Sequence, residues 1–169
     1  MGVTIRLLKI IAVVGVVGLT IGFIYFAFFR PAEAPQPKVV AELAKTQYQV
    51  GEEISVKPYL INMGKRPITV FSGVPLLFAK VYDAEKREVT PVTTPKLLIL
   101  APYTLKPQMP YYNEDDRWPG LLEAYTFTLD QPGRYKVVAW TEFSLDKDYA
   151  YPLHIYADPI WIEVVTGSN

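Results

Sequence analysis

Residues 124–143 read AYTFTLDQPGRYKVVAWTEF, and this stretch decides the fold class of the chain. Two segments with alternating character, Ala124–Leu129 and Arg134–Phe143, flank the sequence Asp130-Gln-Pro-Gly133. An alternation with a period of two places one set of side chains on each face of a strand, and Pro with Gly between two such runs is typical of a turn. The stretch therefore predicts two β-strands joined by a turn.

The same periodicity recurs along the chain from Lys38 onward, where no amphipathic helix pattern of useful length occurs. Further strands are expected at Lys38–Lys45, Ile54–Asn62, Ile68–Phe71, Leu76–Tyr82, Glu88–Val92, Leu97–Ala101 and Pro159–Val165. Turns are expected at Tyr48–Glu53, Met63–Pro67 and Asp83–Arg87. About eight strands with turn signals at this spacing favour an antiparallel β-sandwich, with a barrel as the structural alternative.

Two of these stretches resemble a known family. They are YQVGEEISVKPYLINMGKRPITVF, residues 48–71, and FTLDQPGRYKVVA, residues 127–139. Both are similar to the bacterial and archaeal immunoglobulin-like domains typified by the BsuPI proteinase-inhibitor family. The resemblance implies an immunoglobulin-like sandwich over residues 38–166, with Tyr135 folded back as a tyrosine corner. The family name implies protease inhibition, but no reactive loop is matched here, so only the fold is carried over.

The segment Ile10–Phe29, IIAVVGVVGLTIGFIYFAFF, contains twenty residues and no charge. A helix of this length covers about 30 Å, the hydrocarbon thickness of a bilayer. Arg6 and Lys9 precede it and Arg30 follows it. The sequence therefore predicts a single transmembrane helix in the cell membrane, with residues 1–9 in the cytoplasm and the β domain outside.

A cleaved secretory signal is the alternative interpretation of this segment, because Ala32-Glu33-Ala34 offers an A-x-A site. The apolar run is longer than an ordinary signal sequence, and Pro35 directly follows the site. Both features favour a retained anchor. Residues 30–37 are rich in proline and predict an extended spacer of about 20 Å, and residues 167–169 form a short tail.

Gly15, Gly18 and Gly22 fall on one face of the expected helix. Small residues on one face let a second helix approach closely, although glycine is also simply common in membrane helices. The expected partners are accordingly membrane lipid and other membrane-protein subunits.

Composition excludes several classes of function. The chain has no cysteine, so disulfides, thiolate metal ligands and cysteine nucleophiles are absent. Fourteen basic and 17 acidic residues follow Pro31, which gives this part of the chain a net charge of −3. A nucleic-acid-binding surface needs an excess of positive charge, so this composition does not predict one. Eight Asn and Gln beside fifteen Pro resemble the balance of a thermophile, and a domain without disulfides suits a prokaryotic envelope, with archaea among the expected sources.

No residue set predicts catalysis or a cofactor. His154 is the single histidine, and it lies between prolines and aromatic residues. Mononuclear copper centres of the cupredoxin type need two His and one Cys, which this chain cannot supply. Asn113-Glu-Asp-Asp116 could bind Ca²⁺, but it lacks the spacing of a calcium loop and reads as a solvated acidic turn. We expect neither an enzyme nor a bound metal.

Two long loops carry aromatic residues, and both are expected to be largely free of strands. The first covers residues 102–119 and the second covers Leu145–Pro159. Loops of this length are usually functional, and Tyr, Trp, Met and Arg are enriched at contact surfaces. Capping of the open end of the sandwich is a compatible alternative. The candidate interaction residues of the first loop are Tyr103, Met109, Tyr111, Tyr112, Arg117 and Trp118.

These features predict a non-catalytic, single-pass membrane protein that acts as an accessory or structural subunit of a larger membrane complex. An archaellin-like or pilin-like filament subunit is one alternative, although Pro31 ends the expected helix promptly. A tethered extracytoplasmic domain that binds a ligand or a protease is another.

Overall fold

The computed structural model describes residues 34–89, 97–113 and 124–167. The chain divides into two compact units, Met1–Ala34 and Pro35–Asn169, and almost all described residues belong to the second. Across the described ranges, no helix has both the length and the apolar character needed to cross a membrane. The expected anchor, with Gly15, Gly18 and Gly22, lies outside them.

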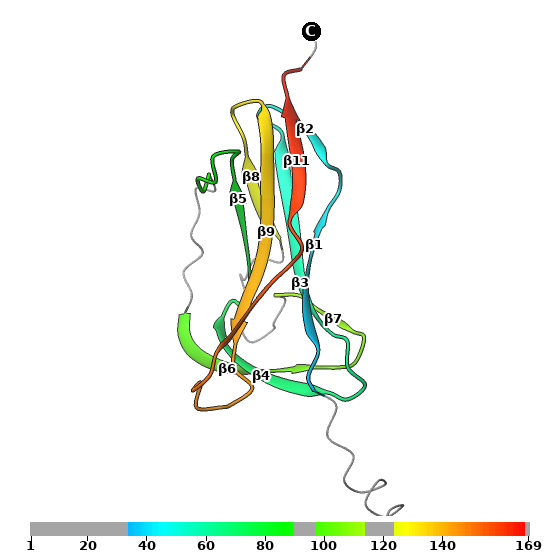
Figure 1. Ribbon diagram of the computed structural model, residues 1–169, viewed down its shortest axis with the longest axis vertical. Helices are drawn as coiled ribbons and strands as arrows, with labels where there is room; N and C mark the ends of the chain where they lie inside the picture. The colour runs from blue at the N-terminus through cyan, green and yellow to red at the C-terminus, as the bar shows by residue number, and fades with distance from the viewer. Residues whose placement is uncertain (1–33, 90–96, 114–123, 168–169) are drawn as a thin grey trace, which may run out of the picture. The chain divides into compact units, whose positions relative to one another are not determined.

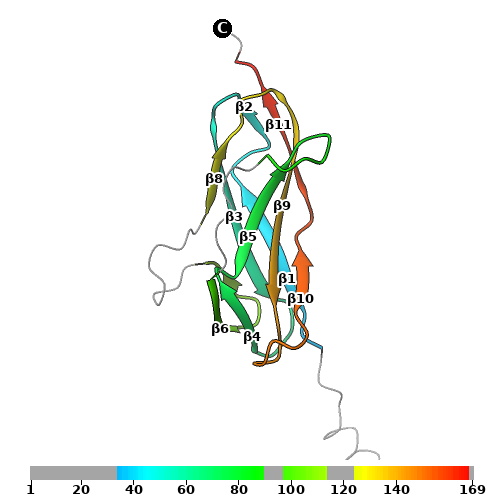
Figure 2. The same ribbon diagram turned by 90° about the vertical axis from the view of Figure 1, so that its left-hand side faces the viewer.

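The described part of the second unit is built from β-strands, as predicted, and these form three sheets (Figures 1 and 2). The first sheet contains β1 (Pro37–Leu43), β3 (Glu53–Asn62), β7 (Pro110–Tyr111) and β8 (Tyr125–Thr128). The second contains β2 (Gln47–Gln49), β5 (Leu77–Tyr82), β9 (Gly133–Phe143), β10 (Leu153–Tyr156) and β11 (Ile160–Val165). The third pairs β4 (Ile68–Val74) with β6 (Leu97–Leu105).

Strand pairing is antiparallel with one exception among the described strands. β2 runs parallel to β11, with Tyr48 opposite Val164. The expectation of a wholly antiparallel sandwich is therefore wrong at this edge. β2 itself occupies part of the segment predicted as a turn, because its three residues are too few to show an alternation.

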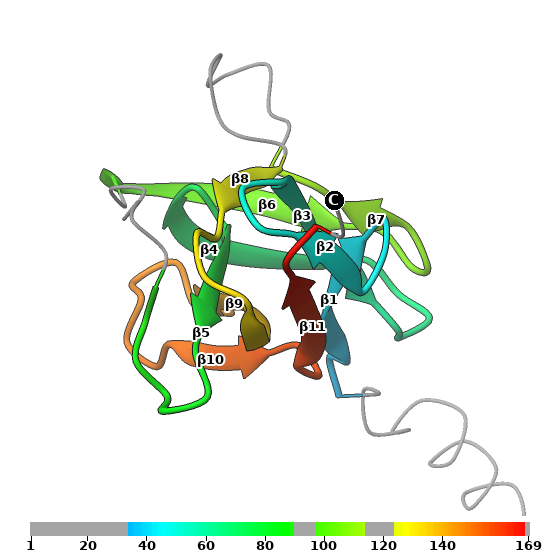
Figure 3. The ribbon, with the colours of Figure 1, turned by 90° about the horizontal axis from the view of Figure 1, so that it is seen from above.

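The first two sheets face each other, and the apolar side chains between them form the core (Figure 3). Ile54 and Val56 of β3 pack against Val81 of β5 and Val137 of β9, and all four side chains are fully buried. A second cluster surrounds Phe143 at the end of β9, where the β4–β6 ribbon crosses the domain. Because both clusters draw only on residues after Pro35, the second unit has a core of its own.

The tyrosine corner is confirmed. The hydroxyl of Tyr135 donates a hydrogen bond to the carbonyl of Gln131 at 2.9 Å, which closes the turn before β9. Burial of this hydroxyl, together with the nearby carboxylates Asp83, Asp130 and Glu85, raises the pKa of Tyr135. The motif therefore positions the longest described strand of the second sheet.

The expected strand boundaries differ from the structure around the two aromatic loops. β6 continues from Ala101 to Leu105 and β7 lies at Pro110–Tyr111, so the first loop is not free of strands. β10 occupies Leu153–Tyr156 inside the second predicted loop. It was missed because its four residues, between Pro152 and Pro159, are too short a run for alternation to identify a strand.

Candidate functional site

The outer face of the second sheet carries a row of aromatic side chains. Alternate residues of β9, from Tyr135 to Phe143, point into the core, whereas Trp140 lies on the opposite face. Trp140 is in register with Phe78 of β5 on one side and with Tyr156 of β10 on the other. Because directly paired residues share a sheet face, three rings from three strands lie side by side.

The rings of this row are in contact. The centroids of Phe78 and Trp140 lie 4.6 Å apart with an interplanar angle of 18°, and those of Trp140 and Tyr156 lie 6.4 Å apart at 30°. Phe78 is 7% exposed, but Tyr156 is 62% exposed. The row is therefore anchored in the sheet at β5 and open to solvent at β10.

A second row crosses the same face nearer to the start of β9. Tyr82 of β5, Lys136 of β9 and Trp161 of β11 are in register. The Lys136 ammonium lies 5.3 Å from the centroid of the Tyr82 ring, and the Arg134 guanidinium lies 4.4 Å from that of Trp161. Such cation–π contacts hold long basic side chains against the sheet. We call the five residues Phe78, Tyr82, Trp140, Tyr156 and Trp161 the aromatic face.

Hydrogen-bonded polar pairs border the aromatic face. Lys80 donates to Glu88 Oε2 at 2.8 Å, and this hydrogen bond raises the pKa of Lys80. Glu142 accepts a hydrogen bond from the Tyr149 hydroxyl at 2.6 Å. Burial and then this bond to Glu142 raise the pKa of Tyr149 well above its usual range. The resulting border is polar around an aromatic centre, which is the composition of a protein contact surface.

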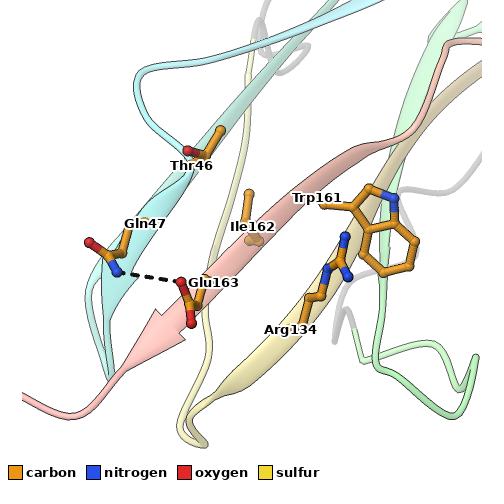
Figure 4. A pocket seen from close by; sticks show the side chains of 6 residues that line it. All are labelled: Thr46, Gln47, Arg134, Trp161, Ile162 and Glu163. Atoms are coloured by element: carbon orange, nitrogen blue, oxygen red, sulfur yellow. Dashed lines mark hydrogen bonds between the residues drawn. The ribbon is translucent and has the colours of Figure 1, made fainter.

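A shallow hollow of about 530 Å³ opens at the β11–β2 edge of this face (Figure 4). Its lining residues come from β9, β11, β2 and the residue before β2, and they are Thr46, Gln47, Arg134, Trp161, Ile162 and Glu163. Gln47 Nε2 lies 3.5 Å from Glu163 Oε2. The Arg134 guanidinium stacks on Trp161, and no described residue forms an ion pair with it. Hydrogen-bond donors and acceptors thus lie beside an indole that is 45% exposed.

The candidate residues of the first aromatic loop do not share one environment. Tyr103 is 3% exposed, and its hydroxyl lies 3.4 Å from the Gly73 carbonyl. Tyr111 is partly buried, and its ring meets that of Tyr103 edge-on at 5.4 Å. Tyr103 belongs to the apolar core around Phe143, and Tyr111 packs against that core.

The remaining candidates lie nearer to solvent or outside the described residues. Tyr112 packs on Tyr59 with ring centroids 5.5 Å apart, and the Lys57 ammonium lies 4.5 Å from its ring centroid. Met109 is 54% exposed. Arg117 and Trp118 lie outside the described residues.

The described residues contain no group of three His, Asp or Glu side chains placed to hold a metal ion. Asn113, the first residue of the acidic turn, is buried and uses its amide to bind the backbone of Leu77. His154 Nδ1 lies 3.6 Å from Glu142 Oε2 on the sheet surface. Among the described side chains His154 has no hydroxyl nucleophile as a hydrogen-bond partner.

Sequence reasoning did not identify the aromatic face. The signal was present within single strands, since Trp140 and Trp161 occupy outward positions of alternating segments. What was missing is the order of the strands. Phe78, Trp140 and Tyr156 become neighbours only because β5 and β10 pair with opposite edges of β9.

Comparison with known proteins assigns no family. No family model matches the sequence, and no curated protein matches it. Similar solved structures include the CARDB domain of the PF1109 protein from Pyrococcus furiosus, solved with di-metal ions. It is 14% identical with a TM-score of 0.42, and the match covers 79% of this chain and 90% of that one.

Two other solved structures are similar over part of their length. Spo0M, a sporulation control protein from Bacillus subtilis, is 18% identical with a TM-score of 0.44, and the match covers 78% of this chain and 50% of that one. A beta-glucosidase from Listeria innocua is 12% identical with a TM-score of 0.37, covering 79% of this chain. The chain spans half of the Spo0M structure and 16% of the beta-glucosidase structure.

Proposed function

We propose that this chain is a non-catalytic, single-pass membrane protein whose β domain acts as an accessory subunit of a larger membrane assembly. In this proposal residues 10–29 anchor the chain and the β domain lies outside the cell. The domain holds a partner subunit through the aromatic face. The observation that carries the proposal is the exposure of that face, with Tyr156 at 62% and Trp161 at 45%.

The domain is further proposed to be an immunoglobulin-like sandwich. The support is the Tyr135–Gln131 corner before β9 and the pairing of two facing sheets around a shared core. Domains of this architecture present their sheet faces and their end loops to partners, so a contact through the second sheet fits the fold. This assignment concerns architecture and implies no activity.

The exposed aromatic residues of the aromatic face are explained better by binding of a protein partner than by a contribution to the stability of the isolated domain. Exposed Trp and Tyr add little to the stability of an isolated domain, whereas they are enriched where protein surfaces meet. Arg134 is already stacked on Trp161, so less side-chain freedom would be lost on binding. A partner that covers Tyr156 and Trp161 would remove two large apolar side chains from water.

Purification of the full chain in mild detergent from its native membrane tests the proposal. The unmodified chain is expected to migrate with at least one other subunit. Substituting Tyr156→Ser and Trp161→Ser should release the partner, because both side chains lie at the proposed contact. Tyr151→Ser is the matched control, since Tyr151 is 82% exposed but lies outside the aromatic face. Migration of the unmodified chain as a lone monomer would remove the proposal.

The glycine face of the expected helix makes a separate contribution that can be tested in the same assay. Gly18→Leu and Gly22→Leu place bulky side chains where a second helix would approach. If the helix takes part in assembly, these variants lose the partner while the aromatic face is intact. Retention of the partner in both variants would confine the contact to the β domain.

Binding of a small ligand is a second candidate function, favoured by the hollow beside Trp161. A ligand with hydroxyl groups and an apolar ring face could stack on the indole and exchange hydrogen bonds with Gln47 and Glu163. Screening the 35–169 fragment against a glycan array, with Trp161→Ala as the negative control, tests this function. If no glycan gives a signal that is lost in Trp161→Ala, the ligand-binding function is rejected and the accessory role is the one proposal that remains.

A further inference from the structure

The chain enters the β domain at one defined corner. The Gln36 carbonyl accepts a hydrogen bond from the Met63 N–H at 2.8 Å, and Pro37 is in register with Asn62. The start of β1 therefore lies against the turn that follows β3. In Figures 1 and 2 this corner is at the end of the domain opposite to the C-terminal end of β11.

Asn62 fastens two turns together at this corner. Its Oδ1 accepts from the Gly64 N–H at 3.0 Å, and its Nδ2 donates to the Arg66 carbonyl at 2.7 Å and to the Leu105 carbonyl at 3.2 Å. The Asn62 carbonyl also accepts from the Gln108 N–H at 2.9 Å. Asn62 is fully buried, so these bonds fix the 63–67 turn against the 106–109 turn.

Both turns carry exposed basic residues and no acidic residue. Lys65 and Arg66 lie in the first turn and Lys106 lies in the second, and none has an ion-pair partner among the described residues. Met63 and Met109 are 45% and 54% exposed at the same place. We call these five residues the entry corner.

The other described turns differ in charge. The loop after β9, at the same end of the domain, combines Asp146 and Asp148 with Lys147. At the far end, the turn after β5 contains Asp83 and Glu85, and Arg87 is bonded to both carboxylates. Among the described turns, those of the entry corner therefore combine several basic side chains with no acidic residue and no ion pair.

We infer that the entry corner docks on the anionic surface of a lipid bilayer. This inference rests on the proposed membrane anchor. Even a fully extended chain from Phe29 to Gln36 would be about 25 Å long, so an anchored apolar segment would keep the entry corner close to the membrane. Three basic side chains near lipid phosphate groups are attracted electrostatically, and flexible methionine side chains pack readily into the boundary between headgroups and acyl chains. Docking would set the orientation of the aromatic face relative to the membrane.

Fluorescence quenching in nanodiscs tests the inference with the full chain. Because the chain has no cysteine, Met109→Cys carries a single polarity-sensitive fluorophore, and Glu85→Cys carries the same label at the far end. Discs made from equal parts of phosphatidylglycerol and phosphatidylcholine contain a headgroup-labelled nitroxide lipid. The Met109→Cys label should be quenched strongly and the Glu85→Cys label should not. Discs of phosphatidylcholine alone should reduce the quenching at position 109, because only the tether then keeps the corner near the disc.

Neutralising the charge provides the second arm. The triple variant Lys65→Gln, Arg66→Gln and Lys106→Gln should weaken docking by about five-fold per charge, or about a hundred-fold in total. The control removes three cations at the far end, Lys45→Gln, Lys86→Gln and Arg87→Gln, of which Lys45 and Arg87 are ion-paired, and it should leave quenching unchanged. These side chains are exposed at their turns, so the core is untouched by either set.

The outcomes separate this inference from the proposed function. A chain that stays apart from the discs during size-exclusion chromatography would remove the anchor and the docking together. A chain that enters the discs but shows equal quenching at positions 109 and 85 would overturn the docking alone. Equal quenching at Met109→Cys in anionic and zwitterionic discs would also overturn it, since the recognised chemistry is the lipid charge.

Discussion

Asn113 and Leu77 exchange two hydrogen bonds across 36 positions of the chain. The Leu77 N–H donates to Asn113 Oδ1 at 3.0 Å, and Asn113 Nδ2 donates to the Leu77 carbonyl at 2.9 Å. The side-chain amide thereby reproduces the pairing that a neighbouring strand would supply. It satisfies the backbone N–H of Leu77, the first residue of β5, and it shares the Leu77 carbonyl with the Tyr125 hydroxyl, which donates to the same oxygen.

We expect Asn113→Asp to destabilise the domain. A carboxylate cannot donate to the Leu77 carbonyl, and it would be buried beside it because position 113 is 1% exposed. The expected loss in the free energy of unfolding is about 2–3 kcal/mol. Urea denaturation of the 35–169 fragment measures it. Gln131→Glu, an exposed amide changed in the same way, should cost less than about 0.5 kcal/mol.

Tyr135→Phe isolates the contribution of the tyrosine corner. The change removes only the hydroxyl that donates to the Gln131 carbonyl and leaves the ring in the core. The free energy of unfolding should fall by about 1 kcal/mol, and a hydrogen-exchange measurement should show faster opening of the 130–134 turn. An unchanged stability would mean that the corner guides folding without stabilising the folded domain.

Tyr48→Phe makes the same chemical change with the opposite expectation. The Tyr48 hydroxyl is buried and has no hydrogen-bond partner among the described residues. Removing it relieves an unsatisfied polar group, so the free energy of unfolding should stay constant or rise by up to about 1 kcal/mol. Thermal unfolding of the two Tyr→Phe variants side by side checks the contrast. A loss at position 48 equal to that at position 135 would show that Tyr48 has a partner in solution.

The fold class followed from residues whose side chains obey one strict rule. In β3 and β9, every second residue is buried, because one face of each strand meets the core while the other does not. That geometry makes apolar residues alternate with polar ones along the sequence. β2 and β10 show no such pattern of useful length, since they have three and four residues and lie at the edges of the second sheet.

The candidate site depended on information that a linear pattern does not contain. Tyr103 was expected in a contact loop because it lies in an aromatic stretch between prolines, but β6 continues through it and turns the ring inward. Asn62 was recognisable only as the last residue of a strand. Its bond to the Leu105 carbonyl crosses 43 positions and becomes visible once the 63–67 and 106–109 turns are seen side by side.

Gly51→Ala should destabilise the turn between β2 and β3. Gly51 has a φ of +77°, a conformation that L side chains adopt at a cost of about 1–2 kcal/mol. A Cβ at this position would meet no atom within 4 Å, so the loss would come from the backbone alone. Gly51→Asn should recover part of it, because Asn tolerates this region better. Gly167→Ala is the control, since it adds the same methyl group at ordinary contact distance from Gln49.

Acid should weaken the domain through carboxylates whose pKa is lowered on folding. The hydrogen bond from the Lys45 ammonium to Glu52, at 2.5 Å, and that from the Gln49 N–H lower the pKa of Glu52. Burial raises the pKa of Asp83, but hydrogen bonds from the Arg87 backbone and guanidinium outweigh it and lower the pKa overall.

A carboxylate whose pKa is lower in the folded chain stabilises the fold above its unfolded pKa, about 4, and this contribution disappears as the pH falls through the folded pKa. Stability should therefore be flat from about pH 7 to pH 5 and decline below about pH 4. Lys45→Met removes the main cause of the Glu52 shift, so urea titrations should show a shallower acid decline. Lys147→Met, a lysine without an ion-pair partner among the described residues, should leave the decline unchanged. Identical slopes in both variants would show that the Lys45–Glu52 pair carries no part of the acid sensitivity.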